Sequence, residues 1–315
     1  MAARVSGSGS ASSELAGSAH NIILSFISGF AFFLLNPELK SYRNESIIVL
    51  LPWQGLLGVF GKPLALHQFD IGIIVMAHEI VLVGFYLLTL VYSVIIHEVS
   101  HGVAALWLGD MTAKYAGRLN LNPWKHIDPF GSVILPVLLF ISTGFAFGWA
   151  KPVPYNPYNL RHQKWGPTVV ALAGPFSNLL LASIAALIAK MLPLTLSAKI
   201  DILNRFIGVI GGGGDFLERF GLLSDAISGS IAGIFFGLLL LVIFWNVVLA
   251  CFNLLPIPPL DGSKLLYALV PIKERSIFFF EQYGLFLLII IVFFFSAPVS
   301  IFINSVLGFF LRFTL

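Results

Sequence analysis

Long uncharged apolar segments constrain the fold of this chain more than any other feature of its sequence. Residues 230–255 form one such segment, which includes GLLLLVIFWNVVLACFNLL and no charged residue. A helix that crosses the hydrocarbon core of a bilayer needs about 20 apolar residues. Only 10% of the residues are charged, whereas soluble domains have about 25%. The sequence therefore predicts an integral, multi-pass membrane protein in a lipid bilayer. It contains no cluster of basic residues, so it does not indicate a nucleic-acid partner.

The apolar segments predict an all-α transmembrane bundle of about six spans. Besides 230–255, the candidate segments are 20–36, 46–60, about 71–108, 131–148, 167–192 and 277–313. The segment at 71–108 is longer than a membrane is thick, so we expect it to break or to project, with Gly84 as a weak point. Pro298 interrupts the last segment, which predicts one span and then a shorter terminal helix.

Polar stretches divide the chain into four parts. Residues 1–18 are small and polar, which predicts a disordered tail. Residues 19–70 hold N-terminal membrane segments whose topology the sequence does not determine. We expect a core at 71–296, with a polar, Gly-rich insertion at 193–229, and a short C-terminal helix at 297–315.

The motif HEVSH, at residues 97–101, lies at the end of a long apolar run. Ionisable groups at membrane depth are costly and usually functional. On a helix, His97 and His101 share one face, one turn apart, where both imidazoles can bind one metal ion. Glu98 lies about 100° round the helix and can reach a water at the metal without being a ligand. Because Cys251 is the only cysteine, a Cys-based zinc site and an intrachain disulfide are excluded.

Two histidines need a third protein ligand to form a catalytic zinc site. Asp261 is the favoured candidate, because it follows an apolar helix in the sequence NLLPIPPLDG. The prolines end that helix and force an extended segment, and such backbone is tolerated at membrane depth where it lines a protein cavity. Other acidic candidates are Asp110, Asp128, Asp215, Glu218, Asp225 and, for a different class of HExxH membrane protease, Glu281.

HEVSH at 97–101 followed by NLLPIPPLDG at 253–262 resembles the site-2 protease family of intramembrane zinc metalloproteases. The family pairs HExxH with N-x-x-P-x-x-x-x-D-G, and the second pattern fits here at Asn253, Pro256, Asp261 and Gly262. GDMTAKYAGRLNLNPWKHIDPFG, GWAKPVPYNPYNLR and ALAGPFSN resemble blocks of the compact bacterial and archaeal branch that has no PDZ domain. The resemblance covers roughly residues 85–295.

This resemblance implies one zinc ion per chain, held by His97, His101 and Asp261. It implies that Glu98 is the general base, and that the enzyme hydrolyses peptide bonds in transmembrane helices of other proteins. Asn178, in AGPFSN, matches a family asparagine near the active site and could donate to the oxyanion or to substrate backbone. Asn253 is a second candidate of this kind. For each asparagine, a structural role within the helices is the alternative.

Two other functions remain open on the sequence alone. A metal-binding membrane transporter would also place histidines and carboxylates in the membrane, but it gives no role to Glu98. An inactive homologue could act as a scaffold, and an intact Glu98 argues against it.

The positive residues predict the topology. Lys114, Arg118 and Lys125 follow the HEVSH helix, and basic residues also follow Asp261, so both helix ends should be cytoplasmic. We therefore expect a cell-membrane protein with its active site nearer the cytoplasmic side. The chain can then make only one net membrane crossing between the end of the HEVSH helix and the start of the helix at 230–255. We expect residues 131–157 to be re-entrant beside the active site, since 131–148 is short and KPVPYNP can return as extended chain.

Overall fold

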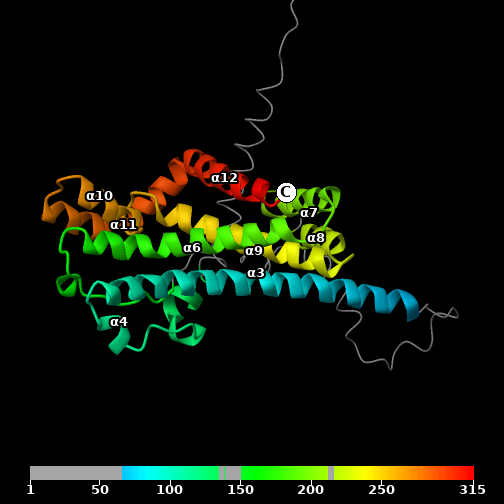
Figure 1. Ribbon diagram of the computed structural model, residues 1–315, viewed down its shortest axis with the longest axis horizontal. Helices are drawn as coiled ribbons and strands as arrows, with labels where there is room; N and C mark the ends of the chain where they lie inside the picture. Colours follow the sequence, from blue (N-terminus) through cyan, green and yellow to red (C-terminus); the bar gives the residue numbers. More distant parts are fainter. Residues whose placement is uncertain (1–65, 135–137, 139–149, 212–215) are drawn as a thin grey trace, which may run out of the picture.

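The computed structural model describes residues 66–134, 138, 150–211 and 216–315. These residues form helices and connecting loops without any strand, so the predicted all-α class is confirmed. The long helices are α3 (Leu66–Trp107), α6 (Gly166–Met191), α9 (Ile231–Asn253), α11 (Glu274–Phe294) and α12 (Ser296–Phe313). Of these, α3, α6 and α9 lie lengthwise against one another (Figure 1). The shorter ones are α4 (Thr112–Tyr115), α7 (Leu196–Gly211), α8 (Phe216–Ile227) and α10 (Gly262–Leu269).

Four of the described helices are long and apolar enough to cross a membrane: Val81–Trp107 of α3, then α6, α9 and α12. The predicted membrane segments at 20–36 and 46–60 and the predicted tail at 1–18 lie outside the described residues. The total of about six spans therefore stays a prediction.

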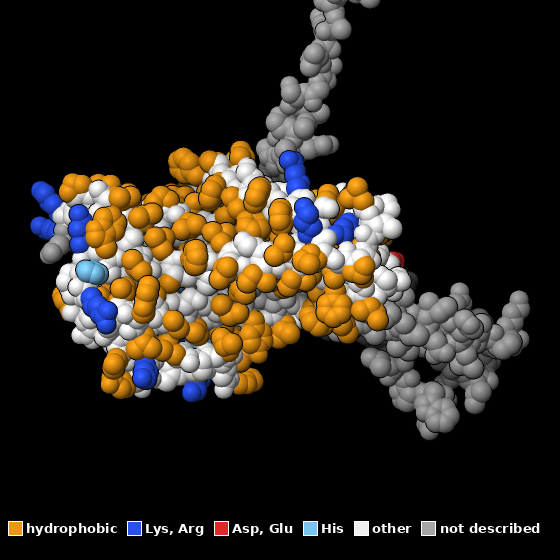
Figure 2. All heavy atoms as spheres, in the orientation of Figure 1, with side chains coloured by type: hydrophobic (Ala, Val, Ile, Leu, Met, Phe, Trp, Pro, Cys, Tyr) orange, Lys and Arg blue, Asp and Glu red, His pale blue; other side chains and the backbone are white. Residues whose placement is uncertain are grey.

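Helix α9 is the centre of the bundle. Its side chains from Leu240 to Cys251 are almost all buried against α3, α6 and α12. The indole nitrogen of Trp245 donates a hydrogen bond to the Tyr86 carbonyl at 3.0 Å, which joins α9 to α3. The outer helices expose large apolar side chains instead, as the orange surface in Figure 2 shows. Such a surface suits contact with lipid, whose tails are as apolar as these side chains.

Helix α3 is one continuous helix of 42 residues. Of the two expected alternatives, a break or a projection, the projection is seen in Figure 1, where the N-terminal part of α3 extends beyond the bundle and the helix continues through Gly84. A glycine costs a helix only about 1 kcal/mol. Breaking the helix would leave backbone groups without partners at membrane depth, which costs more.

The segment 193–229, for which the sequence predicted a polar, Gly-rich insertion, is largely helical. It forms α7 and α8, whose inner faces belong to the main apolar core through Ile202, Phe206, Phe220 and Leu223. The buried Lys199 side chain donates hydrogen bonds to the carbonyls of Ala189, Lys190 and Thr314. It thereby binds α7 to the C-terminal ends of α6 and α12. The segment reads as polar in the sequence because each helix also has a polar outer face.

The predicted interruption near Pro298 is present, because α11 ends at Phe294 and α12 begins at Ser296. The terminal helix is longer than the expected short helix, since α12 has 18 residues and qualifies as a membrane span. Proline is tolerated here because it lies in the first turn of α12, where its missing N–H has no partner to lose.

The described ends of the connection between α3 and α6 lie together at one end of the bundle. The Arg161 N–H donates to the Leu108 carbonyl, next to the end of α3, at 2.9 Å. Within this segment, the Lys151 N–H donates to the His126 carbonyl, also at 2.9 Å. The chain therefore makes no net crossing between α3 and α6, as a re-entrant segment requires. Most of the path predicted to re-enter, residues 135–137 and 139–149, lies outside the described residues.

Candidate metal centre

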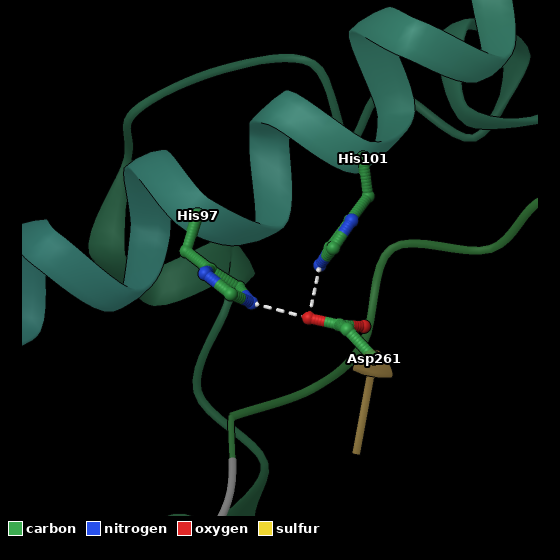
Figure 3. Close-up of side chains that lie close together, drawn as sticks. All are labelled: His97, His101 and Asp261. Atoms are coloured by element: carbon green, nitrogen blue, oxygen red, sulfur yellow. Dashed lines mark hydrogen bonds and ion pairs between the residues drawn. The ribbon is translucent and has the colours of Figure 1, made fainter. Parts of the chain in front are cut away.

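The side chains of His97, His101 and Asp261 meet where α3 passes the loop between α9 and α10 (Figure 3). The Nε2 atom of His97 lies 3.0 Å from Oδ2 of Asp261, and Nε2 of His101 lies 3.4 Å from the same oxygen. One donor atom from each side chain lies within 4.8 Å of the others. Within the described part of the chain, this is the one group of three or more such side chains with a spacing that suits a metal ion.

A backbone carbonyl determines which nitrogen of His101 can bind a metal. The Nδ1 atom of His101 lies 2.8 Å from the Val170 carbonyl oxygen in α6, and both are buried. A carbonyl can only accept a hydrogen bond, so Nδ1 must hold the proton. The Nε2 atom then keeps its lone pair and faces Asp261.

Asn178 determines the same choice for His97. The Asn178 Oδ1 atom lies 2.6 Å from Nδ1 of His97. The Asn178 Nδ2 atom faces two oxygens, the Ser93 carbonyl at 3.2 Å and Oδ1 of Asn246 at 2.7 Å. Nδ2 must therefore be the donor to these oxygens, and Oδ1 must accept from His97. Both histidines thus present an unprotonated Nε2 to one point, the arrangement that metal-ligating histidines normally have.

Gly174 in α6 makes room for both imidazole rings. A Cβ atom at this position would lie 2.5 Å from Cε1 of His101 and 2.7 Å from Cε1 of His97. Any larger residue would push the rings away from Asp261. Gly174 belongs to the ALAGPFSN block, but no local pattern marks it, because its role depends on packing between α3 and α6.

The loop after α9 holds Asp261 in place. A Cβ atom on Gly262 would lie 2.2 Å from the Leu254 carbonyl oxygen, so only glycine lets α10 begin this close to the end of α9. The Thr168 hydroxyl in α6 donates to the Lys264 carbonyl at 3.1 Å. The Asp261 side chain is 21% exposed, whereas the two histidine side chains are nearly buried. The carboxylate therefore lies on the open side of the site.

Glu98 lies outside the ligand group and contacts the Pro-rich segment instead. Its Oε2 atom accepts a hydrogen bond from the Val153 N–H at 3.0 Å. The Val153 side chain is buried and sits against Gly102, where a Cβ atom would lie only 2.8 Å from Val153 Cγ1. The base predicted from the sequence is thus half-buried and fixed to the segment that contains Pro152 and Pro154.

Among the acidic candidates whose side chains are described, none belongs to this ligand group. Buried Asp110 accepts hydrogen bonds from Thr112, Asn156 and Asn159, and Asp128 accepts one from the Gly131 N–H. Asp225 is exposed at the end of α8. Glu281 forms an ion pair with Lys264. Asp215 lies outside the described residues, and the side chain of Glu218 is not described.

The two candidate asparagines have different surroundings. Asn178 is completely buried, and both ends of its amide are engaged by protein groups. Asn253 is half-buried at the end of α9, where its Nδ2 donates to the Leu249 carbonyl of the same helix at 2.9 Å. This geometry favours a supporting role for Asn178 and leaves one amide hydrogen of Asn253 for another acceptor.

The donor set fits zinc. Two imidazole nitrogens and one carboxylate form a three-ligand set of the kind found in catalytic zinc sites, which keep a further position open. Each histidine also has the second hydrogen bond that fixes its ring and raises its basicity. The Asp261 carboxylate oxygen lies close to both histidine Nε2 atoms, so the three donor atoms can reach one shared cation position.

Comparisons with known proteins agree with this donor set. Residues 85–296 match the description "Peptidase family M50". The chain belongs to peptidase family M50. This M50 peptidase is 33% identical over 195 residues to a Bacillus subtilis protein named "Putative zinc metalloprotease YwhC", covering 62% of this chain and 73% of that protein. It is 27% identical over 213 residues to a Mycolicibacterium smegmatis protein named "Putative zinc metalloprotease Rip2", covering 66% of this chain and 68% of that protein. No solved structure matches significantly.

The M50 peptidase is therefore an intramembrane zinc metalloprotease, as the paired motifs predicted. It is a multi-pass membrane protein that works on membrane-embedded substrates in a lipid environment. Nothing in the site or in the comparisons favours a transporter or an inactive scaffold.

Proposed function

We propose that this M50 peptidase cleaves transmembrane helices of other membrane proteins, using one Zn²⁺ held by His97, His101 and Asp261 and using Glu98 as general base. The convergence of the two Nε2 atoms on Oδ2 of Asp261, at 3.0 and 3.4 Å, carries this proposal. The hydrogen bonds to Val170 and Asn178 support it, because they leave both Nε2 atoms free to bind metal.

The bound zinc supplies Lewis acidity, which lowers the pKa of water towards about 7. In the proposed reaction, Glu98 takes a proton from the attacking water and later passes it to the leaving amine. The Val153 N–H holds the Glu98 carboxylate in one orientation. We assign to Asn178 the positioning of His97, because both of its amide hydrogens are used within the protein and no donor is left for the substrate. Asn253 remains the candidate donor to the oxyanion.

The segment around Pro152, Pro154 and Pro157 is the proposed binding edge for substrate. A helical substrate must unwind before its carbonyls are accessible, because helical hydrogen bonds use them. Extended chain can then pair with an extended edge. The Lys151 N–H donates to the His126 carbonyl, and the Val153 N–H donates to Glu98 Oε2. These two bonds define which edge of the segment faces the protein.

The distribution of basic residues supports a cytoplasmic active site in the cell membrane. Among the described residues, nine Lys and Arg lie in the loops and helix starts at the metal-centre end: Lys114, Arg118, Lys125, Lys151, Arg161, Lys164, Lys264, Lys273 and Arg275. Five lie at or near the opposite end: Lys190, Lys199, Arg205, Arg219 and Arg312. Cytoplasmic loops carry the excess of positive residues.

The decisive experiment incubates the purified protein with a panel of transmembrane segments, with and without a zinc chelator. We expect cleavage within the apolar part of at least one segment, lost with the chelator and regained when zinc is added back. Zinc transport across vesicles without any cleavage would support the transporter instead.

Single cysteines test the orientation. In a Cys251→Ser background, Tyr158→Cys and Val270→Cys should react with an impermeant thiol reagent from the cytoplasmic side, because both positions are exposed at the metal-centre end. Asp225→Cys, exposed at the other end, should react from the opposite side. The reverse pattern would place the active site away from the cytoplasm.

A further inference from the structure

A second buried amide, that of Asn246, continues the hydrogen-bonded path from the metal centre into the middle of the bundle. Asn246 interrupts the apolar sequence of α9 and is 1% exposed. Its Oδ1 atom accepts from Nδ2 of Asn178 at 2.7 Å. Its Nδ2 atom donates to the Ser93 hydroxyl and to the Val242 carbonyl, each at 2.9 Å. The path therefore joins α9, α6 and α3.

Every hydrogen bond on this path has a determined direction. The Val242 carbonyl can only accept, so the amide nitrogen of Asn246 must face it and Oδ1 must point at Asn178. Oδ1 of Asn246 and the Ser93 carbonyl oxygen are both acceptors, so the Asn178 nitrogen must donate to both. The Asn178 oxygen is then left for the protonated Nδ1 of His97.

We infer that Asn246 is a positioning residue for the metal centre, which acts through Asn178 to keep the lone pair of His97 Nε2 directed at the metal position. The inference rests on the ligand set proposed above. Without Asn246, the Asn178 nitrogen keeps only the longer 3.2 Å contact with the Ser93 carbonyl. The amide of Asn178 can then turn over and present a donor to His97, which favours the tautomer that cannot bind the metal.

A purely structural role for Asn246 predicts a different outcome. Asparagines between membrane helices also act as interhelical hydrogen bonds that stabilise the bundle. Such a bond would affect unfolding whether or not zinc is present, and its loss would add to the loss at Asn178. A positioning role instead affects zinc affinity, and only while Asn178 is present.

A double-mutant cycle separates these roles. Zinc affinity is measured on the purified full-length protein by competition with a chelating indicator, for the parent, Asn246→Leu, Asn178→Leu and the double variant. Loss of a group that supports a metal ligand typically weakens binding by about 10- to 100-fold. We expect about a 10-fold loss for Asn246→Leu, a larger loss for Asn178→Leu, and no further loss in the double variant beyond about two-fold.

Two matched variants complete the test. Val247→Ala changes a fully buried neighbour on the same turn of α9 that is not on the path, and it should bind zinc like the parent. Ser93→Ala removes one of the two acceptors of the Asn246 amide and should weaken zinc binding by about 2- to 10-fold. If Asn246→Leu does not fold, Asn246→Ala removes the same amide without added bulk and is judged by the same criteria.

The results have distinct meanings. Parent-like zinc affinity in the Asn246 variant, or losses that multiply in the double variant, would overturn the inference. His97→Ala, measured alongside, tests the ligand set itself. If that variant binds zinc like the parent, the proposed site is wrong, whatever the Asn246 variants do.

Discussion

The Nδ1 atom of His97 lies 2.6 Å from the side-chain oxygen of Asn178, which is 81 residues further along the chain. This contact ties the first histidine of the HEVSH motif to α6, just as the Val170 carbonyl ties the second. Neither imidazole can rotate without breaking a buried hydrogen bond. The metal centre is therefore held by the packing of α3 against α6, and its chemistry depends on groups well outside the motif.

Glu98→Gln should bind zinc normally but lose at least about 100-fold in cleavage rate, the usual loss when a general base is removed. Glu98 contacts Val153 rather than the ligand group, so the metal should be retained. Zinc content and cleavage are measured on the same sample. A fully active variant would contradict the proposed mechanism.

Asp261→Ala should lose zinc on dialysis, because two histidines alone give fewer protein ligands than catalytic zinc sites have. Asp225→Ala is the matched control, since Asp225 is exposed and distant from the ligand group. Asp128→Ala is a second control, in a loop at the metal-centre end. Loss of zinc in a control, with full retention in Asp261→Ala, would move the site elsewhere.

Gly174→Ala should weaken zinc binding by at least about 10-fold, the lower range for loss of ligand support. The added methyl group would lie 2.5 to 2.7 Å from atoms of both imidazoles, so the rings must move. Gly208→Ala provides the comparison, because a Cβ atom there has nothing within 4 Å. That variant should keep its zinc and gain helix stability.

Val153→Pro should lower the cleavage rate by about 10-fold while zinc content stays unchanged. The substitution removes the N–H that holds Glu98, and hydrogen bonds to charged groups are worth about 1.5–3 kcal/mol. The neighbours Pro152 and Pro154 already favour extended chain here. Val153→Ala keeps the N–H but loses the contact with Gly102, so it should lose less activity than the proline variant. Equal losses in both would assign the effect to the side chain.

Asp110 should give the loop at the metal-centre end a pH-dependent stability. Burial raises the pKa of Asp110, but hydrogen bonds from Thr112, Asn159 and Asn156 outweigh this, so its pKa lies below the ordinary value of 3.8. Because the pKa of Asp110 is lower in the folded protein than in the unfolded chain, the charged carboxylate stabilises the fold at pH values above the ordinary pKa. This stabilisation is lost as the pH falls through the lowered pKa of the folded state. Asp110→Asn should therefore lower the unfolding midpoint Tm at neutral pH, and the difference should shrink in acid below pH 3.8. A difference that persists there would exclude the charge as its cause.

The sequence was most informative where the pattern is local. The four-residue spacing of His97 and His101 is enough to place both on one helical face, because helices repeat every 3.6 residues. The sequence favoured Asp261 as the third ligand, but spacing alone could not establish it, because its approach to α3 depends on how α9 packs. Spacing also revealed nothing of Asn246, whose partner Ser93 lies 153 residues away.

Two features of the fold depend on packing rather than on local composition. Helix α3 continues through Gly84 because unbroken hydrogen bonds matter more in a membrane than one poor helix former. Residues 193–229 looked polar because their apolar residues are spread at helical spacing, yet Phe206 and Phe220 are fully buried. In both cases the packing of distant segments decided what local composition could not.

The proposed ligands of the metal centre are separated by most of the folded core, so the site can be completed only late in synthesis. Asp261 follows His97 by 164 residues, which a ribosome adding about 5–20 residues per second needs roughly 8–33 s to synthesise. During that interval the growing chain holds only two of the three proposed ligands, His97 and His101. A chain still being made cannot cut the other membrane proteins that are inserted beside it. Proteolysis begins only when α9 has joined the bundle and the loop behind it has emerged.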